Sequence, residues 1–370
     1  MRCRAALALA ACRGAPVGWC DHRRPRRRCN ATACWADGVC GSADSVWRPL
    51  SGDFSNATLR GRVEIVVSHC SVPLAWLDGD IAALAARGVD VTRVSVYSKC
   101  GGGGDVGLKF EPAVVYDYDN VGRCDHSYAA HLAEAYDSLE DMTLFTKDSF
   151  RSQPRRRRRE LADVVAGAAA HGFGCGVGSE ASDWYDGPTL RAWTIPKYRK
   201  AWDQNRGRRP RSGGFASPQF RALGAWLESV VAVGLAHGAA PDQRAHAASA
   251  LSRAATPVCL GGTFAATRAG ARSLGAEGWR AVARSLDRGD NIQEGHFAER
   301  AWATLLAPDP APALAAWVAC AHRGVVVARK SKRHRQPYCP FAGMLHAGGL
   351  GACDPGRTPP NATCGGLKAR

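Results

Sequence analysis

The sequence predicts an α/β protein with an open, mostly parallel sheet flanked by helices and with Cys-rich irregular extensions at both ends. Short β-branched runs alternate with helical patterns from residue 62 onward. Hydrophobic residues make up 46% of the 370 residues, which suffices for a large core and excludes a wholly disordered chain. The cysteines crowd the two ends of the chain: Cys20, Cys29, Cys34 and Cys40 at one end, and Cys320, Cys339, Cys353 and Cys364 at the other.

The first regular elements are a strand over 63–68, a helix over 74–87 and a strand over 91–97. The β-branched run at 63–68 is typical of a buried strand. The helix is indicated by apolar residues at helical spacing: Leu74, Leu77, Ile81 and Leu84. Gly88 then provides a stop signal. These three elements make one strand–helix–strand unit, which favours parallel pairing of the two strands.

A glycine-rich loop at 101–104 leads to a third strand over 113–116, a helix over 122–139 and a fourth strand over 142–146. One helix face is marked by Tyr128, Leu132, Ala135, Tyr136 and Leu139. The alternation of strand and helix therefore continues, as a parallel sheet requires.

The stretch 151–258 interrupts this rhythm and is expected to be a variable insert with helical patches at 220–233 and 241–255. A strand-like run at 262–267 and a helix over 291–306 follow. The expected organisation is a basic leader over 1–61, an α/β domain over 62–306 and a Cys-rich tail over 307–370. No apolar run is long enough for a transmembrane segment.

The N-terminal residues resemble a short secretory signal, with Arg2 and Arg4 before an apolar stretch at 5–11. Three N-glycosylation sequons are present: Asn30, Asn56 and Asn361. Together with the crowded cysteines they predict a disulfide-containing chain of the secretory pathway, in the Golgi or ER lumen or secreted. A zinc site at Cys339, Cys353 and Cys364 with His334 or His346 is the alternative, but no Cys-x-x-Cys spacing supports it.

The formal net charge of +16 makes acidic partners expected. The arginine run at 155–159 can bind acidic polysaccharide, act as a protease or nuclear-targeting signal, or form a solvated surface loop. With a secretory location, we expect glycan rather than nucleic acid as the partner.

The segment 119–126 joins a strand end to a helix start, where open α/β sheets bind their ligands. Gly122 allows close backbone approach, and Arg123 can pair with a phosphate or carboxylate. Ordinary helix capping by Asn120 is an equally good interpretation of the spacing.

The segments Asn120-Val-Gly-Arg through Tyr128, Tyr136-Asp-Ser-Leu and Thr143 through Asp148 resemble motifs of an uncharacterised eukaryotic family, the domain of unknown function 3431 family. Later motifs of that family resemble 261–265 and 294–302, and Cys124 and Glu140 depart from its pattern. The order of parts is similar to inverting glycosyltransferases of the GT-A fold, which implies a GT-A-like (Rossmann-like) domain over 62–306.

This resemblance implies transfer of a sugar from a nucleotide-sugar donor to a glycan or protein hydroxyl. The residues expected to bind the nucleotide-sugar are Asn120, Gly122, Arg123, Asp125 and Lys147. A non-catalytic glycan-binding or scaffold protein that retains the fold is the alternative.

A metal site for Mn²⁺ or Mg²⁺ is a second implication, at the place where such enzymes carry a D-x-D motif after the fourth strand. Here only Asp148 stands at that place, and Lys147 beside it can substitute for the metal charge against a diphosphate. A D-x-D does occur one strand earlier, at Asp117 and Asp119, whose carboxylates would point to the same side of an extended chain.

The helix over 291–306 carries the expected catalytic residues. Glu299 or Glu294 would be the general base that deprotonates the acceptor hydroxyl, with His296 assisting or binding the acceptor. Asn291 and Glu294 also have the spacing of a capping box, which would make Glu294 structural. A solvated helix face with Arg300 is the third interpretation.

Overall fold

The computed structural model describes residues 59–101, 104–152, 159–176, 182–195, 215–237, 240–253 and 255–309. The signal-like stretch, the three sequons, the crowded cysteines of both ends and residues 155–158 of the arginine run lie outside these residues. The predicted Cys-rich extensions are therefore not part of the structure described below.

The main sheet has six strands in the order β3-β2-β1-β4-β8-β5. The strands are β1 (Gly61–His69), β2 (Val89–Ser98), β3 (Ala113–Asp117), β4 (Met142–Lys147), β5 (Phe173–Cys175) and β8 (Phe264–Thr267). The first four pair in parallel, whereas β8 runs antiparallel to both of its neighbours. The predicted α/β class with a mostly parallel sheet is confirmed.

The two faces of the sheet follow from the alternation of side chains along β1. Val63, Ile65 and Val67 belong to one core cluster, with residues of α4 (Ala75–Ala86) and α6 (Leu161–His171). Val66 belongs to the other cluster. Both faces are apolar, as expected for central parallel strands covered by helices.

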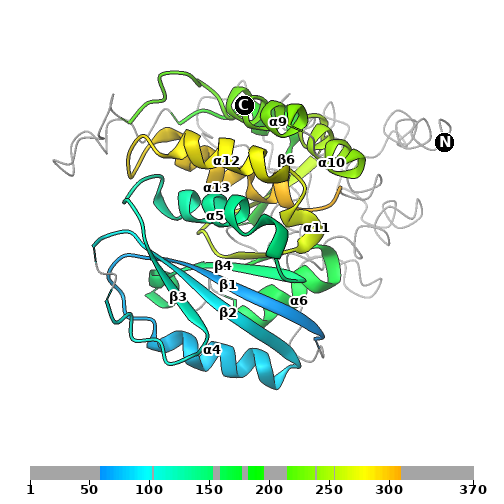
Figure 1. The fold of residues 1–370 in the computed structure, drawn as a ribbon. Coiled ribbons are helices and arrows are strands. Elements are labelled where there is room, and N and C mark those ends of the chain that lie inside the picture. Colours follow the sequence, from blue (N-terminus) through cyan, green and yellow to red (C-terminus); the bar gives the residue numbers. More distant parts are fainter. Residues whose placement is uncertain are drawn as a thin grey trace, which may run out of the picture.

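The second face is covered by α5 (Arg123–Glu134), α9 (Leu223–Ala236), α12 (Gly275–Leu286) and α13 (Gln293–Leu306). In Figure 1 these helices lie on one side of the sheet and α4 lies on the other. Large buried side chains such as Trp226, Trp279 and Trp302 fill this layer. The thicker helical layer thus comes mostly from the second half of the described chain.

The other elements are η1 (Tyr136–Ser138), η2 (Asp148–Ser152), β6 (Ser182–Asp186), α7 (Gly187–Arg191), α10 (Pro241–Ser252), β7 (Ala255–Cys259) and α11 (Arg268–Ala271). β6 and β7 form a separate antiparallel pair. The predicted insert is thus integrated into the fold, because it supplies β5 to the main sheet and α6 to one of its faces.

The predicted helix over 122–139 is too long at its C-terminal end. α5 ends at Glu134, and the 3₁₀ turn η1 follows it. The apolar pattern in the sequence extends beyond Glu134 because Tyr136 and Leu139 still pack against the same core cluster after the helix has ended.

Two disulfides occur among the described residues. Cys70–Cys100 joins the chain just after β1 to the chain just after β2, and Cys175–Cys259 joins β5 to β7. Cys124 is a free thiol. No helix in the described ranges is long and apolar enough to cross a bilayer.

Candidate functional site

The carboxyl ends of the four parallel strands meet at one edge of the sheet. In the order β3-β2-β1-β4, β2 and β3 extend the sheet on one side of β1, and β4 extends it on the other side. The strand order thus reverses at β1, and open α/β sheets bind ligands beside such a reversal. The residues that directly follow β2, β3 and β4 are Lys99, Tyr118 and Asp148. The polar candidates of this part of the sequence therefore gather at the expected edge.

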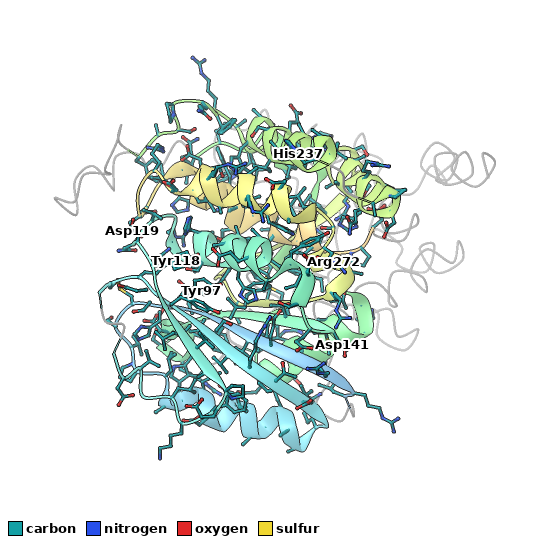
Figure 2. The ribbon with its side chains drawn as sticks, in the orientation of Figure 1. Tyr97, Tyr118, Asp119, Asp141, His237 and Arg272 are labelled. Carbon is teal, nitrogen blue, oxygen red and sulfur yellow. A yellow bond between two sulfur atoms is a disulfide. The ribbon has the colours of Figure 1, made fainter. Side chains whose placement is uncertain are left out.

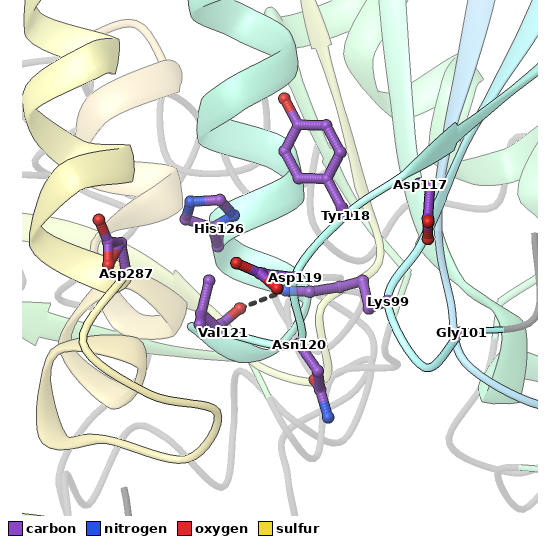
Figure 3. Close-up of a pocket in the computed structure, with 9 residues that line it drawn as sticks. All are labelled: Lys99, Gly101, Asp117, Tyr118, Asp119, Asn120, Val121, His126 and Asp287. Carbon is purple, nitrogen blue, oxygen red and sulfur yellow. Dashed lines mark hydrogen bonds between the residues drawn. The ribbon is translucent and has the colours of Figure 1, made fainter. Parts of the chain in front are cut away.

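A cavity of about 710 Å³ opens at this edge, and nine residues line it: Lys99, Gly101, Asp117, Tyr118, Asp119, Asn120, Val121, His126 and Asp287. Figure 3 shows these residues coming from the ends of β2 and β3, the start of α5 and the chain after α12. In Figure 2, Tyr118 and Asp119 lie at the opposite end of the sheet from Asp141, which precedes β4. The volume is within the usual range for small-molecule sites.

Lys99 lines the cavity and also contacts the backbone at the start of α5. Its side chain is 5% exposed, and its Nζ donates hydrogen bonds to the carbonyl oxygens of Val121 and Arg123. Burial lowers the pKa of Lys99 to about 8, against smaller opposite effects of Cys124 and Asp290. Lys99 thus fixes the backbone from which α5 begins.

The start of α5 has an unusual backbone. Gly122 and Arg123 have φ values of 58° and 56°, in the left-handed region. A Cβ atom on Gly122 would come within 2.7 Å of Leu286. Asn120 does not cap the helix, because Gly122 is the N-cap residue and no side chain caps it. Gly122 is therefore required for packing against α12, and Asn120 lines the cavity instead.

Arg123 reaches α13 and contacts two of the predicted catalytic residues. Its Nη1 lies 3.4 Å from Oε2 of Glu299 and 3.4 Å from Nδ1 of His296. Glu299 also accepts a hydrogen bond from the backbone N–H of Gly261 at 3.1 Å, and Arg300 lies 3.5 Å from its Oε2. Arg123, Glu299 and His296 are therefore brought together as one cluster.

The charges of this cluster follow from burial and pairing. Burial alone would raise the pKa of Glu299, but Arg123, Arg300 and the Gly261 N–H together lower it. Burial lowers the pKa of His296 to about 4, and the Arg123 charge adds to this effect. At neutral pH the cluster thus holds an ionised carboxylate, guanidinium groups and a neutral imidazole.

Glu294, in the first turn of α13, pairs with a different arginine. Its Oε2 accepts a hydrogen bond from Arg288 at 2.7 Å. Asn291 interacts with Nε2 of His296 at 3.0 Å, and α13 begins after Ile292 without a side-chain cap. The capping-box interpretation is therefore wrong, because both of its side chains are used by other partners.

Asp125 and Lys147 occupy different environments. Asp125 is fully buried and accepts a hydrogen bond from the indole N–H of Trp302 at 2.6 Å. Burial raises the pKa of Asp125 to about 6, although Arg123 lowers it in part. Lys147 is half-buried, and its ammonium group makes no hydrogen bond or ion pair within the described ranges. The Asp125 side chain is thus used within the fold, whereas the ammonium group of Lys147 can donate hydrogen bonds to a ligand.

The three predicted metal ligands do not form one group. Asp117 and Asp119 both line the cavity, as a D-x-D motif on an extended chain predicts. Asp148 does not line it, and its Oδ2 accepts backbone N–H bonds from residues 70–72 at 2.9–3.0 Å. Burial would raise the pKa of Asp148, but these three N–H groups lower it. No group of three or more metal-binding side chains occurs among the residues described.

Of the nine lining residues, six were not among the site residues predicted from the sequence, and they include Lys99, His126 and Asp287. Lys99 follows β2 directly, so its position at a strand end was a usable signal. The Nδ1 of His126 is buried and has no hydrogen-bond partner within the described part of the chain. Burial lowers the pKa of His126 to about 4, with Lys99 adding to the shift, so the imidazole is neutral at physiological pH.

Comparisons of the chain with protein-family models, curated proteins and solved structures found no match. The chemistry of the cavity and of the Arg123 cluster is therefore the basis on which a function is inferred.

Proposed function

We propose that the protein is a glycosyltransferase that binds a nucleotide-sugar at the carboxyl edge of its sheet and transfers the sugar to a glycan or protein hydroxyl. The observation that carries this proposal is the polar cavity at the ends of β2 and β3, next to the start of α5. The resemblance of segments 120–128, 136–139 and 143–148 to a GT-A-like organisation supports the same assignment.

The nucleoside part of the donor fits the cavity. Asp117 and Asp119 are carboxylates of the kind that accept hydrogen bonds from ribose hydroxyls in nucleotide-binding α/β proteins. Tyr118 contributes an aromatic ring beside them, and Asn120 an amide that can donate and accept hydrogen bonds. A nucleoside therefore finds both polar and aromatic contacts here.

The diphosphate needs cations, which the cavity itself lacks because Lys99 is held by backbone carbonyls. Within the described part of the chain, the guanidinium of Arg123 uses only Nη1, toward Glu299 and His296, and its other N–H groups are the ones we assign to a ligand. Lys147 is the second cation. Burial raises the pKa of the Cys124 thiol, and the charges of Arg123 and Lys147 both act to lower it, so both cations are near this residue. We assign the phosphates to Arg123 and Lys147.

Mn²⁺ or Mg²⁺ is a further part of the proposal. Asp117 and Asp119 would hold it, because one or two carboxylates together with substrate phosphates are the usual ligands of Mg²⁺ in nucleotide sites. Asp148 is the weaker ligand candidate, since one of its oxygens already accepts three backbone N–H groups.

The acceptor would lie toward α13, where Glu299 acts as the general base and His296 contacts the acceptor, with Glu294 as the alternative base. The neutral imidazole of His296 faces Arg123 with Nδ1 and Asn291 with Nε2, so an acceptor hydroxyl would have to replace one of these partners. Glu299 is ionised, as a base must be, although both of its oxygens have partners.

A non-catalytic glycan-binding protein is the second candidate, and the pairing of Glu299 favours it. A carboxylate that is held by two arginines and a backbone N–H is a poorer proton acceptor than a free one. In either case we propose a secretory-pathway location, because the sequons agree with the two described disulfides.

The proposal is tested by thermal unfolding of the full chain with a panel of nucleoside diphosphates and nucleotide-sugars, with and without Mn²⁺. At least one nucleotide should raise the melting temperature. Arg123→Ala should weaken the binding of that nucleotide by about 1.5–3 kcal/mol if Arg123 pairs with a phosphate. Arg280→Ala, at an exposed arginine of α12, is the control. A panel without any shift contradicts the donor site.

A further inference from the structure

Asp287 lines the cavity from a different element than the other two carboxylates do. It is the C-cap residue of α12, whereas Asp117 and Asp119 lie at the end of β3. Its side chain is exposed and makes no hydrogen bond or ion pair within the described part of the chain. Since an ionised carboxylate has only acceptor sites, Asp287 can accept hydrogen bonds from a ligand in the cavity.

The backbone that carries Asp287 is held against the start of α5. The N–H of Gly122 donates a hydrogen bond of 2.7 Å to the carbonyl oxygen of Gly289, and a Cβ atom on Gly122 would come within 2.7 Å of Leu286. His126 lies one helical turn further on, where its N–H donates to the carbonyl oxygen of Gly122 at 3.2 Å. Asp287 and His126 therefore belong to one wall of the cavity, whose backbone is held in place by the fold itself, as a selective site requires.

Two rings continue this wall. The centroid of the His126 imidazole lies 5.9 Å from that of the Tyr118 ring, and Figure 3 shows His126 between Asp287 and Tyr118. The Tyr118 hydroxyl donates a hydrogen bond to Glu134, which holds this ring in place. Burial lowers the pKa of His126 to about 4, so its ring is neutral at physiological pH. A neutral, planar ligand can therefore stack on these rings while its edge reaches Asp287.

Among the common nucleobases, guanine alone presents two adjacent donors to a carboxylate. Its N1–H lies beside its N2 amino group, and the two carboxylate oxygens can accept both hydrogen bonds. Adenine and cytosine carry an amino group beside an acceptor nitrogen, and uracil carries N3–H between two carbonyl groups. In these three bases an acceptor atom of the base would face an acceptor oxygen of Asp287, which opposes binding.

We propose that the nucleotide in the cavity carries guanine and that Asp287 selects this base. The inference rests on the proposed nucleotide-sugar site and names its donor as a guanosine diphosphate sugar. Asp117 and Asp119 remain for the ribose or a metal ion. Arg123 and Lys147 remain for the phosphates. The carboxylate of Asp287 thus meets the uncharged end of the nucleotide, away from the phosphate charges that would repel it.

The experiment measures dissociation constants of the full chain by titration calorimetry in the presence of Mn²⁺. The probes are the diphosphates of guanosine, inosine, xanthosine, uridine, adenosine and cytidine. Guanosine diphosphate should bind at least about tenfold more tightly than the uridine, adenosine and cytidine diphosphates. Inosine diphosphate keeps N1–H and lacks the N2 amino group, so its affinity should lie between that of guanosine diphosphate and those of the other three.

Asp287→Asn keeps the shape of the side chain and replaces one acceptor oxygen with an amino donor. The variant should bind guanosine diphosphate at least about tenfold more weakly and xanthosine diphosphate more tightly, because xanthine has a carbonyl group in place of the N2 amino group. A gain for xanthosine diphosphate cannot come from loss of folding. Asp290→Asn is the control, since it removes a nearby exposed carboxylate that does not line the cavity and should leave the preference for guanine unchanged.

The outcomes separate the choice of base from the donor site. Tightest binding of another diphosphate, equal binding of all of them, or a retained preference for guanine in Asp287→Asn overturns the role of Asp287 and leaves a nucleotide site in place. Binding of none of these diphosphates rejects the proposed donor site, and the selection of guanine with it.

Discussion

Arg123 at the start of α5 and Glu299 in the middle of α13 lie 3.4 Å apart, from Nη1 to Oε2. The two residues are 176 positions apart in the chain. Glu299 also holds the backbone N–H of Gly261, just before β8. A single carboxylate thus ties together three segments that surround the carboxyl edge of the sheet.

Glu299→Gln should lower the free energy of unfolding by about 1–3 kcal/mol, because an amide cannot neutralise Arg123 and Arg300 in a site where Glu299 is 14% exposed. Urea denaturation measures this. Glu277→Gln, which breaks an exposed pair with Arg280, should cost less than about 0.5 kcal/mol. If Glu299 is also the base, turnover should fall by about 100- to 10,000-fold. Equal stability of the two variants would contradict the tying role of Glu299.

Gly122→Ala and Gly79→Ala should change stability in opposite directions. At Gly122 the added Cβ meets Leu286 at 2.7 Å and the φ of 58° is unfavourable, so we expect a loss of about 2 kcal/mol or more. Gly79 lies within α4 with nothing within 4 Å of the added atom, so alanine should stabilise by about 0.5–1 kcal/mol. Melting curves of the two variants provide the comparison, and a tolerated alanine at 122 would refute the close approach of α5 and α12.

The alternation of β-branched runs and helical spacing was enough to predict the four parallel strands, although they differ in burial. β1 and β4 are buried along most of their length, whereas β3 is an edge strand whose residues are mostly exposed. The pairing of Cys70 with Cys100 was not predicted. It follows from the parallel pairing of β1 with β2, which brings the two strand ends together. A contact between residues that are distant in sequence leaves no local sequence pattern from which it could be predicted.

β5, α6 and α12 were missed for local reasons. β5 has three residues, one of them glycine, so it has no detectable period. α6 follows directly on an arginine-rich segment, and α12 contains glycines at its first and fourth positions. Within α12, Gly278 lies against α9, because a Cβ there would come within 3.1 Å of the Cα of Gly234. Helix-helix packing therefore overrides the helix propensity that sequence reading relies on.

The candidate site was predicted in part. Asp117, Asp119 and Asn120 line the cavity, and Arg123, Glu299 and His296 form one cluster. The three N–H groups that bind Asp148 belong to the loop after β1, so its role depends on a backbone shape that sequence patterns do not contain.

Lys99→Met should destabilise the fold by about 2–4 kcal/mol, because it leaves the buried carbonyl oxygens of Val121 and Arg123 without their donor. Chemical denaturation checks this. The exposed Lys109→Met is the control and should stay within about 0.5 kcal/mol of the native chain. A native-like stability of Lys99→Met would mean that other groups satisfy these carbonyls.

Asp125→Asn should change how stability depends on pH. The pKa of Asp125 is raised from 3.8 to about 6 on folding, so between these values the folded chain binds a proton that the unfolded chain has lost. Asp125 therefore makes stability fall as pH rises through this window, by up to about 3 kcal/mol. The asparagine keeps an acceptor for Trp302 and removes this effect.

Two histidines also make stability depend on pH, and the difference between the native chain and the variant controls for them. His126 and His296 have lowered pKa values, so their contribution to stability falls as the pH drops below the unfolded value of 6.5 toward about 4, the opposite direction. Subtracting the unfolding free energy of Asp125→Asn from that of the native chain at each pH removes their contribution. A pH-independent difference would show that Asp125 titrates normally.

Hydrogen exchange can show whether a nucleotide binds at the ends of β2 and β3. Exchange of the full chain is followed by mass spectrometry with and without a saturating nucleoside diphosphate and Mn²⁺. With nucleotide in the cavity, we expect slower exchange in segments 99–101 and 117–126, which line or adjoin it, and unchanged exchange in α4 on the opposite face of the sheet. Protection that is confined to other segments, or no protection with any nucleotide, would contradict this binding site.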